Sequence, residues 1–468
     1  MSGLIVEPKH RPELDPGFVP AELWNRAYEA RVEDDPGSVP LIVAITRPDG
    51  TVVRHSTMVL PHDGENIPLN LKYVERIIKL MLWTNGGSGI VIGGHNGLAR
   101  EISNLYMPNG ARSFDCDTVA RRIYLEPMTV SACSLEFVPN ENIATMSLGG
   151  HLDGCRVGFD LGGSDRKCAA VVDGEVVHSE EVEWDPYFES DPQYHFDGIM
   201  DSLRRAAAHL PRVDAIGGSA AGVYVDNEPR VGSLFRGISD EDFATHVRPI
   251  FKNLRHAWKG VPFDVINDGE VTALAAALNF EVDTLLGIAM GTSLASGYCD
   301  SGGRITSRLN ELAFVPVDYR DGAPVDEWSG DLGCGVQYFS QQAVARLAPL
   351  AGLDFPDEMP FAERLIEVQQ LMELGDRRAE SIYETIGVYL GYSIAWYARW
   401  YAIENLLILG RVSSGAGGEM MIHKASEVVT DEFPAFGERL RMMTPDEKFK
   451  RHGQAIAAAS LPRLAHKL

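Results

Sequence analysis

Apolar and polar residues alternate along the first third of the chain in patterns typical of short strands and of one amphipathic helix. The runs LIVAITR and TVVRHSTMVL flank a Pro-Asp-Gly turn and predict a β-hairpin over residues 41–60. Apolar side chains at helical spacing predict a helix over residues 69–83, at Leu71, Val74, Ile77, Ile78 and Met81. With a short helix at residues 21–30 and the strand GIVIGG, residues 1–150 predict a small α/β module of unknown role.

From Cys155 onward the pattern predicts strands and helices in alternation. CRVGFDL is the first predicted strand, and residues 167–184 predict a second hairpin with its turn at Asp173-Gly174. VDAIGG, FDVI, LLGIAM and LLILG predict further strands, and helices are predicted at residues 195–209 and 381–405. Trp396 and Trp400 lie at helical spacing in the second of these helices, which favours a place in the core over a ligand site.

Three of the predicted strands end in turns of small residues. These turns are Asp160-Leu161-Gly162-Gly163-Ser164, Gly291-Thr292-Ser293, and the stretch from Gly410 to Gly415. Glycine lets the backbone approach a phosphate closely, and successive N–H groups form an anion-binding nest. One such turn is more often purely structural, but three of them, each after an apolar strand, favour a nucleotide site.

Asn267 and Asp268 lie between the strand FDVI and an alanine-rich helix. Asn and Asp are good helix N-caps, which is a purely structural role. A carboxylate at the end of a strand, beside phosphate-binding turns, also suits a base for a substrate hydroxyl. Both roles are compatible if Asn267 caps the helix and Asp268 faces a cleft.

The composition excludes several kinds of partner. The 468 residues include 42 Lys and Arg against 66 Asp and Glu, a formal net charge of −24. Nucleic acids and anionic membranes are bound by clustered cations, so neither is expected as a partner. The six cysteines form no C-x-x-C pair, and neither a signal peptide nor a run of about 18 apolar residues is found. A cytoplasmic location is therefore expected.

The order of these motifs resembles the ROK family (repressors, open reading frames, kinases) of the actin-like ATPase and sugar-kinase superfamily. The D-x-G-G-T motif of that family is matched by Asp160, Gly162, Gly163 and Ser164, and its N-D pair by Asn267 and Asp268. The second phosphate motif is partly matched at 291–297, the adenosine turn at 410–415, and the G-E-x-G-H segment at 310–314. The resemblance covers residues 155–465.

The resemblance implies an α/β, two-lobed actin-like ATPase or sugar-kinase (ribonuclease H-like) fold with the N-terminal module added. Residues 151–275 would form the first lobe, completed by a C-terminal helix at 446–468, and residues 276–445 the second. The implied reaction is transfer of the γ-phosphoryl group of ATP, with Mg²⁺, to a hydroxyl of a sugar or polyol. A homodimer is left open.

The resemblance also implies a role for each matching residue. Asp160 would position Mg²⁺, and Asp268 would deprotonate the acceptor hydroxyl. The phosphates would be held by Gly162, Gly163, Ser164, Gly291 and Thr292. Asn267 and Glu311 would bind sugar hydroxyls near the loop ending at Gly222, and Gly410 and Ser413 would border the adenosine.

The chain departs from the family at its zinc site, which consists of a His and the pattern C-x-C-G-x-x-G-C. Phe314 stands in place of the His, and of the cysteines only Cys334 is present, so no structural zinc is expected. Val336 replaces a sugar-binding Glu, which disfavours glucose itself as the substrate. Two residues are left open: Asp165 helps to hold Mg²⁺ or faces solvent, and Arg236 contacts a charged substrate or is a surface cation.

A second hypothesis is a catalytically silent ROK-like protein that binds a ligand or acts as a scaffold. The altered second phosphate turn and the missing sugar contacts favour it, whereas the retained Asp160, Asn267 and Asp268 favour an enzyme. A DNA-binding repressor is not expected, because residues 1–150 contain 13 Lys and Arg against 18 Asp and Glu, a net charge of −5.

Overall fold

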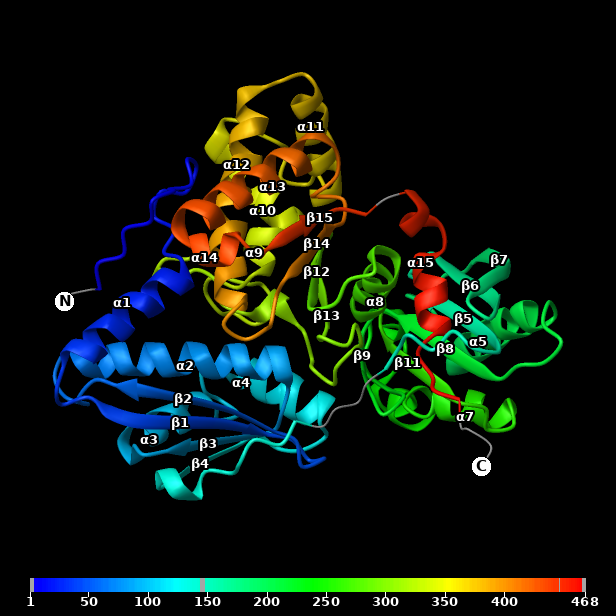
Figure 1. Ribbon diagram of the computed structural model, residues 1–468, viewed down its shortest axis with the longest axis horizontal. Coiled ribbons are helices and arrows are strands. Elements are labelled where there is room, and N and C mark those ends of the chain that lie inside the picture. Colours follow the sequence, from blue (N-terminus) through cyan, green and yellow to red (C-terminus); the bar gives the residue numbers. More distant parts are fainter. Residues whose placement is uncertain (1–3, 144–147, 446, 465–468) are drawn as a thin grey trace. The chain divides into compact units, whose positions relative to one another are not determined.

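The computed structural model describes residues 4–143, 148–445 and 447–464, and the chain divides into two compact units (Figure 1). Unit 1 holds Met1–Ala144, Ile288–Ala295 and Arg308–Met442, and unit 2 holds Thr145–Gly287, Ser296–Ser307 and Met443–Leu468. The N-terminal module therefore packs as part of a larger unit. The predicted domain boundaries stay predictions, and residues 446 and 465–468 of the predicted C-terminal helix lie outside the described residues.

The N-terminal module has the predicted hairpin at its centre. Strands β1 (Val39–Thr46) and β2 (Val52–Val59) pair antiparallel, β3 (Gly89–Gly93) joins β1 antiparallel, and β4 (Thr129–Cys133) pairs parallel with β3. The sheet order is β2-β1-β3-β4. The helices of the module are α1 (Ala21–Asp34), α2 (Asn66–Asn85), α3 (Asn96–Leu105), α4 (Ser113–Asp115) and the π-helix η1 (Cys116–Ile123).

Helix α2 lies along one face of this sheet (Figure 1) and is buried on almost all sides. Its apolar spacing accounts for the side that packs on the module. The other side also lacks solvent, because residues 308–335 of the same unit cover it, and Glu75 and Lys79 are buried there. A single helix thus serves as the core element of the module and as its contact with the rest of unit 1.

The remainder of unit 1 is built around a sheet of order β13-β12-β14-β15. Its strands are β12 (Leu285–Met290), β13 (Leu294–Cys299), β14 (Asn405–Leu409) and β15 (Arg441–Met443), of which β12, β13 and β15 also carry residues of unit 2. Its helices are α9 (Val336–Phe339), α10 (Gln341–Leu347), α11 (Phe361–Glu373), α12 (Arg377–Tyr397), α13 (Gly415–Glu432) and α14 (Pro434–Gly437).

The predicted aromatic helix is wrong at its C-terminal end. Helix α12 ends at Tyr397, and the strand β14 already begins at Asn405. The aromatic residues Trp400 and Tyr401 lie in the turn after the helix and are held there by tertiary contacts. Tyr401 is buried, and the Trp400 carbonyl oxygen accepts a hydrogen bond from Arg308 (2.8 Å). Trp396 is buried, as its helical spacing predicts, whereas Trp400 lies after the end of the helix and is only half-buried.

Unit 2 contains a five-stranded sheet of order β11-β8-β5-β6-β7. Strand β5 (Cys155–Leu161) pairs antiparallel with β6 (Asp165–Val172), which pairs with β7 (Glu175–Glu183). On its other side β5 pairs parallel with β8 (Ala215–Ala220), which pairs parallel with β11 (Phe263–Asn267). The hairpin β9–β10 (Val223–Val225, Glu228–Val231) and helices complete the unit: α5 (Pro192–Ala207), α6 (Asp240–Asp242), α7 (Ile250–Ala257), α8 (Asp268–Phe280) and α15 (Glu447–Ala459).

Helix α15 approaches this sheet closely over two glycines. A Cβ at Gly158 of β5 would overlap the carbonyl oxygen of Ala455, and a Cβ at Gly217 of β8 would overlap that of Ala458. Helix α15 also packs against α8, whose first residue is Asp268. The two glycines therefore set how deeply α15 sits, and α15 in turn supports the helix that carries Asp268.

We expect Gly217→Ala to destabilise unit 2 by about 1–3 kcal/mol, because the added methyl group forces the α15 backbone away from β8. The measurement is the thermal melting transition, followed with Gly322→Ala as the control, since a Cβ at Gly322 has nothing within 4 Å. Equal melting temperatures for both variants would contradict the close approach of α15.

Candidate functional site

The carboxyl ends of three neighbouring parallel strands meet at one edge of the unit 2 sheet. The register places Asp160 of β5 opposite Ser219 of β8, and Ala220 of β8 opposite Asn267 of β11. In open α/β sheets, ligands bind outside the carboxyl ends of parallel strands. The predicted residues Asp160, Asn267 and Asp268 therefore come together here although the sequence separates them widely.

Asp160 is a partly buried carboxylate with an unusual proton affinity. Burial raises its pKa from 3.8 to about 6, and the neighbouring carboxylates Asp268 and Asp165 act in the same direction. The Ser219 hydroxyl and the Lys167 ammonium oppose this shift. A cation placed beside Asp160 would relieve the repulsion among the three carboxylates, which suits the predicted contact with Mg²⁺.

Asn267 has the structural role that its position predicts. Its Oδ1 accepts a hydrogen bond from the Gly269 N–H (2.7 Å) and so caps α8, while its Nδ2 donates to the Gly222 carbonyl oxygen (2.7 Å). The Asn267 side chain thereby fixes the loop that ends at Gly222, whose φ of 125° favours glycine. Its further role as a sugar ligand stays a prediction.

Asp268 is the first residue of α8 and is held in place by the turn that Asn267 caps. Its Oδ1 accepts a hydrogen bond from the Gly269 N–H (2.9 Å). Burial raises the pKa of Asp268, although hydrogen bonds from backbone N–H groups partly offset the shift. A carboxylate whose basicity is raised by burial is better suited to accept a proton from a hydroxyl than an exposed one.

In the first glycine turn, both backbone polar groups of Gly162 are hydrogen-bonded within the protein. The Gly162 N–H donates to the Asp165 carbonyl oxygen (2.9 Å), and the Gly162 carbonyl oxygen accepts from the Trp184 indole (2.8 Å). The Asp165 carboxylate accepts from the Ser164 hydroxyl (2.9 Å) and pairs with Lys167 (3.4 Å). Gly162 therefore shapes the turn, and Asp165 closes it.

The second and third glycine turns lie side by side in unit 1. The Val412 N–H donates to the Met290 carbonyl oxygen (3.1 Å), and a Cβ at Gly410 would overlap the Met290 backbone. The Gly291 N–H is already used by the Ser293 carbonyl oxygen (2.9 Å). The predicted pair of phosphate and adenosine turns is thus contiguous in space, with Gly291 engaged inside its own turn.

A pocket of about 310 Å³ opens beside the third turn. The Gln369 side chain fixes its wall by donating to the Arg411 carbonyl oxygen (2.7 Å) and the Ser414 Oγ (3.0 Å). The lining combines apolar side chains with amide and carboxylate groups, from Ile366, Gln369, Gln370, Met372, Glu373, Ser414, Gly415, Ala416 and Gly417. Such a mixture suits a flat heterocycle with polar edges.

Glu311 lies at the end of α2, where its backbone N–H donates to the Trp83 carbonyl oxygen (2.9 Å). Phe314, which stands at the position of the zinc-binding His, packs against Trp83 with ring centroids 4.2 Å apart. Cys334 is buried, and burial raises the pKa of its thiol to about 12. No group of three or more His, Cys, Asp or Glu that could hold a metal ion occurs among the described residues. The expected absence of zinc stays a prediction.

Sequence reasoning missed two contacts near this site. Ser219 lies in the buried strand AIGGSA and faces Asp160 only through the register of β5 with β8. Tyr187 packs directly on Gly163, which only the folded chain shows, and the Arg236 guanidinium lies 4.0 Å from the Tyr187 ring centroid. Arg236, which the sequence left open, is thus an exposed cation stacked on an aromatic ring.

Comparison with known proteins identifies the fold. No protein-family model matches the chain, and no curated protein sequence matches it. The chain is similar to the ROK hexokinase from Thermus thermophilus, with a TM-score of 0.51 and 18% identity, over 66% of this chain and 97% of that one. A ROK family transcriptional regulator, described as a homolog of the E. coli MLC protein, matches with a TM-score of 0.50 and 18% identity, over 66% and 79%.

A third similar structure is the ROK family glucokinase from Streptomyces griseus in complex with glucose and AMPPNP, with a TM-score of 0.47 and 19% identity, over 67% of this chain and 100% of that one. At these identities the matches show the fold and not the activity. The chain has the α/β, two-lobed actin-like sugar-kinase fold of the ROK proteins, as its motifs predict. Kinases and regulators share this fold, so the activity has to be argued from the site.

Among the described residues, no helix combines the length and apolar character that a membrane span requires.

We expect Asp160→Asn to raise the melting temperature more at pH 7.5 than at pH 5, with a difference of about 2–4 °C. The folded-state pKa of about 6 lies above the ordinary value of 3.8, so the folded chain binds more protons and loses stability as the pH rises from about 4 to 6. Asn carries no charge and removes this loss. Thermal melting without divalent cations is the measurement, and an equal shift at both pH values would contradict the raised pKa.

Proposed function

We propose that the chain transfers the γ-phosphoryl group of ATP to a hydroxyl group of a sugar or sugar-like polyol. The observation that carries the proposal is the pair of carboxylates Asp160 and Asp268 at the carboxyl ends of parallel strands, both with raised pKa values. One carboxylate near a metal ion and one near the acceptor hydroxyl are what phosphoryl transfer needs. The shared ROK fold supports the same conclusion.

Asp268 is assigned as the base. As the acceptor oxygen forms its bond to phosphorus, the Asp268 carboxylate would accept the hydroxyl proton. Because the transition state of phosphoryl transfer is loose, orienting the hydroxyl is the larger part of this task. Proton acceptance would contribute a factor of about 10²–10⁴ in rate. The hydrogen bond from the Gly269 N–H and the cap by Asn267 keep the carboxylate in one place.

The residues around Asp160 fit Mg²⁺. This ion is commonly held by one or two carboxylates together with water and substrate phosphates, so a full cage of protein ligands is not required. When bound, Mg²⁺ would neutralise charge on the phosphates. Asp160 would hold Mg²⁺ directly or through water. The Lys167 ammonium, whose charge lowers the pKa of Asp160, would lie close to the bound phosphates.

The phosphates are assigned to backbone N–H groups of the glycine turns. Gly162 and Gly291 were predicted to contribute, but their N–H groups already close the turns. We therefore assign the phosphate contacts to the N–H groups of Gly163, Ser164 and Thr292. Backbone dipoles suit a chain with a net charge of −24, since they bind an anion without clustered cations.

The nucleoside is assigned to the pocket beside the third turn. Gly410 and Ser413 belong to this turn, and the Ser413 hydroxyl is tied to the Gly410 carbonyl oxygen (3.1 Å). The apolar side chains of Ile366 and Met372 would contact the faces of the adenine ring, and Gln369 and Gln370 its polar edge. The residues assigned to the acceptor are those that the resemblance implies, namely Asn267, Glu311 and Gly222.

A second candidate is a ligand-binding protein without catalysis. The match to a ROK transcriptional regulator and the engaged N–H groups of Gly162 and Gly291 favour it. Turnover of Mg-ATP separates the two candidates. Release of ADP only in the presence of an acceptor from a broad panel of sugars and polyols supports the kinase, and binding without turnover across the whole panel supports the silent protein.

We expect Asp268→Asn to lower kcat by at least about 10²-fold and to leave ATP affinity within about threefold, because the amide cannot accept the proton. Asp191→Asn is the matched control. Asp191 caps α5 through the Gln193 N–H (2.9 Å), and Asn caps helices equally well. Coupled measurement of ADP release and calorimetry of ATP binding give both quantities. Full activity of the Asp268 variant would overturn its assignment.

We expect Ala416→Phe to weaken ATP binding at least about tenfold, because the ring would occupy the pocket beside the third turn and displace the base. Ala416 is exposed at the start of α13 and lines this pocket. Ala435→Phe, at an exposed position of the same unit outside the pocket, is the control. Calorimetric titration with ATP is the measurement, and unchanged affinity in the Ala416 variant would contradict the nucleoside assignment.

A further inference from the structure

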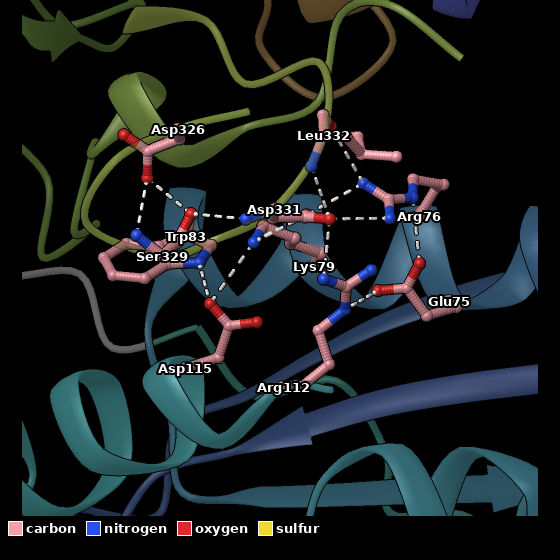
Figure 2. Close-up of polar contacts among 10 residues, drawn as sticks. All are labelled: Glu75, Arg76, Lys79, Trp83, Arg112, Asp115, Asp326, Ser329, Asp331 and Leu332. Atoms are coloured by element: carbon pink, nitrogen blue, oxygen red, sulfur yellow. Dashed lines mark hydrogen bonds and ion pairs between the residues drawn. The ribbon is translucent and has the colours of Figure 1, made fainter. Parts of the chain in front are cut away.

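A cluster of buried charges joins the N-terminal module to the loop of residues 326–334, which belongs to the same unit but is far from the module in the sequence (Figure 2). It contains three carboxylates and three cations, which balance to zero: Glu75, Asp115 and Asp331 with Arg76, Lys79 and Arg112. Lys79 and Asp115 are each 1% exposed and Asp331 is 4% exposed. All but Asp331 come from the N-terminal module.

Asp331 is the centre of the cluster, as Figure 2 shows. It accepts two hydrogen bonds from Arg76 (2.9 and 3.0 Å) and pairs with Lys79 (2.8 Å) and Arg112 (2.7 Å). Burial alone would raise the pKa of Asp331, but the three cations hold it well below its usual range. The loop of residues 326–334 is thus tied to α2 through a carboxylate that stays charged.

The other two carboxylates of the cluster, Asp115 and Glu75, also have charged partners. Lys79 reaches Asp115 (3.5 Å), and Asp115 accepts a hydrogen bond from the Trp83 indole (2.8 Å). Glu75 pairs with Arg112 (2.5 Å) and with Arg76 (2.9 Å). Each cation therefore contacts two carboxylates, so the loss of any one cation leaves two carboxylates with one partner fewer.

The end of α2 makes a second connection, to the segment that carries Glu311. The last carbonyl groups of a helix have no donors within the helix. Here the Thr84 carbonyl oxygen accepts from the N–H groups of Leu309 (3.0 Å) and Asn310 (3.1 Å), and the Trp83 carbonyl oxygen accepts from Glu311 (2.9 Å). Phe314 then packs on Trp83, and Phe114 packs on Phe314 with centroids 5.3 Å apart.

We propose that the N-terminal module positions the acceptor-binding segment 309–311, with Lys79 and Asp331 as the positioning residues. The proposal rests on the proposed function for the role of Glu311. Apolar side chains in place of a buried ion network often give equal or greater stability, so such a network does not by itself explain stability. It does define a single register of α2 against the loop, and with it the place of the α2 carboxyl end that holds Glu311.

The test is Lys79→Met in the full chain. The variant leaves the cluster with one negative charge in excess, so α2 loses its fixed register against residues 326–334. We expect amide hydrogen exchange at residues 309–311 to accelerate at least tenfold, and the KM for the acceptor to rise at least tenfold with the KM for ATP within threefold. The double variant Lys79→Met with Asp115→Asn restores equal numbers of charges, and we expect it to recover most of the protection.

Asp321→Asn is the matched control. Lys72 pairs with Asp321 (2.8 Å) and so also joins α2 to the neighbouring segment of unit 1, but Asp321 is 99% exposed. Exposed pairs of this kind contribute little. We expect both the exchange rates and the kinetic constants of this variant to match those of the unchanged protein.

A milder variant keeps the test open if Lys79→Met does not fold. Arg76→Lys retains the charge and loses the two-point contact with Asp331, so exchange at residues 331–334 should still increase. Unchanged exchange at residues 309–311 in a folded Lys79→Met protein would overturn the proposal, whether or not the chain is a kinase. Faster exchange with an unchanged KM for the acceptor would show a structural role only and would also overturn it.

Discussion

The parallel pairing of β5, β8 and β11 is the constraint on which the candidate site depends. Side chains alternate along a strand, so a shift of one residue would turn Asp160 to the opposite face and remove it from Ser219. The same pairing brings Asn267 to the loop at Gly222, and Asn267 in turn holds the helix that begins with Asp268. The chemistry proposed for unit 2 is therefore a consequence of strand register.

The features that depend on neighbouring residues could be predicted from the sequence. The hairpins, the strand before Asn267 and the cap of α8 follow from local patterns and are confirmed. The burial of Lys79 could not be predicted, because a lysine on a helix normally faces solvent. Lys79 is buried because it pairs with Asp331. Asp331 is far away in the sequence, 255 positions after Arg76, which is another of its partners on α2. The end of α12 was missed because the aromatic residues after it are held by tertiary contacts.

Some features of the candidate site favour the proposed kinase, and others favour the silent alternative. The carboxylates of Asp160 and Asp268 are partly buried and held by their surroundings, which suits the proposed catalysis. In the glycine turns, by contrast, the N–H groups of Gly162 and Gly291 donate hydrogen bonds to carbonyl oxygens of the same turns. Fewer N–H donors would then remain for the phosphates of the proposed nucleotide, and the net negative charge of the chain would not compensate for their loss. Such a site would depend on Mg²⁺ more than a cation-rich phosphate site would.

The close seat of α15 on Gly158 and Gly217 has a consequence during protein synthesis. The two glycines are synthesised well before α15, because Ala455 lies 297 residues after Gly158 and Ala458 lies 241 residues after Gly217. At about 5–20 residues per second, the interval is on the order of tens of seconds. Throughout that time α15 does not yet cover its face of β5 and β8. Unit 2 therefore completes its packing only after α15 has been synthesised, which makes the docking of α15 a late step in the folding of this unit.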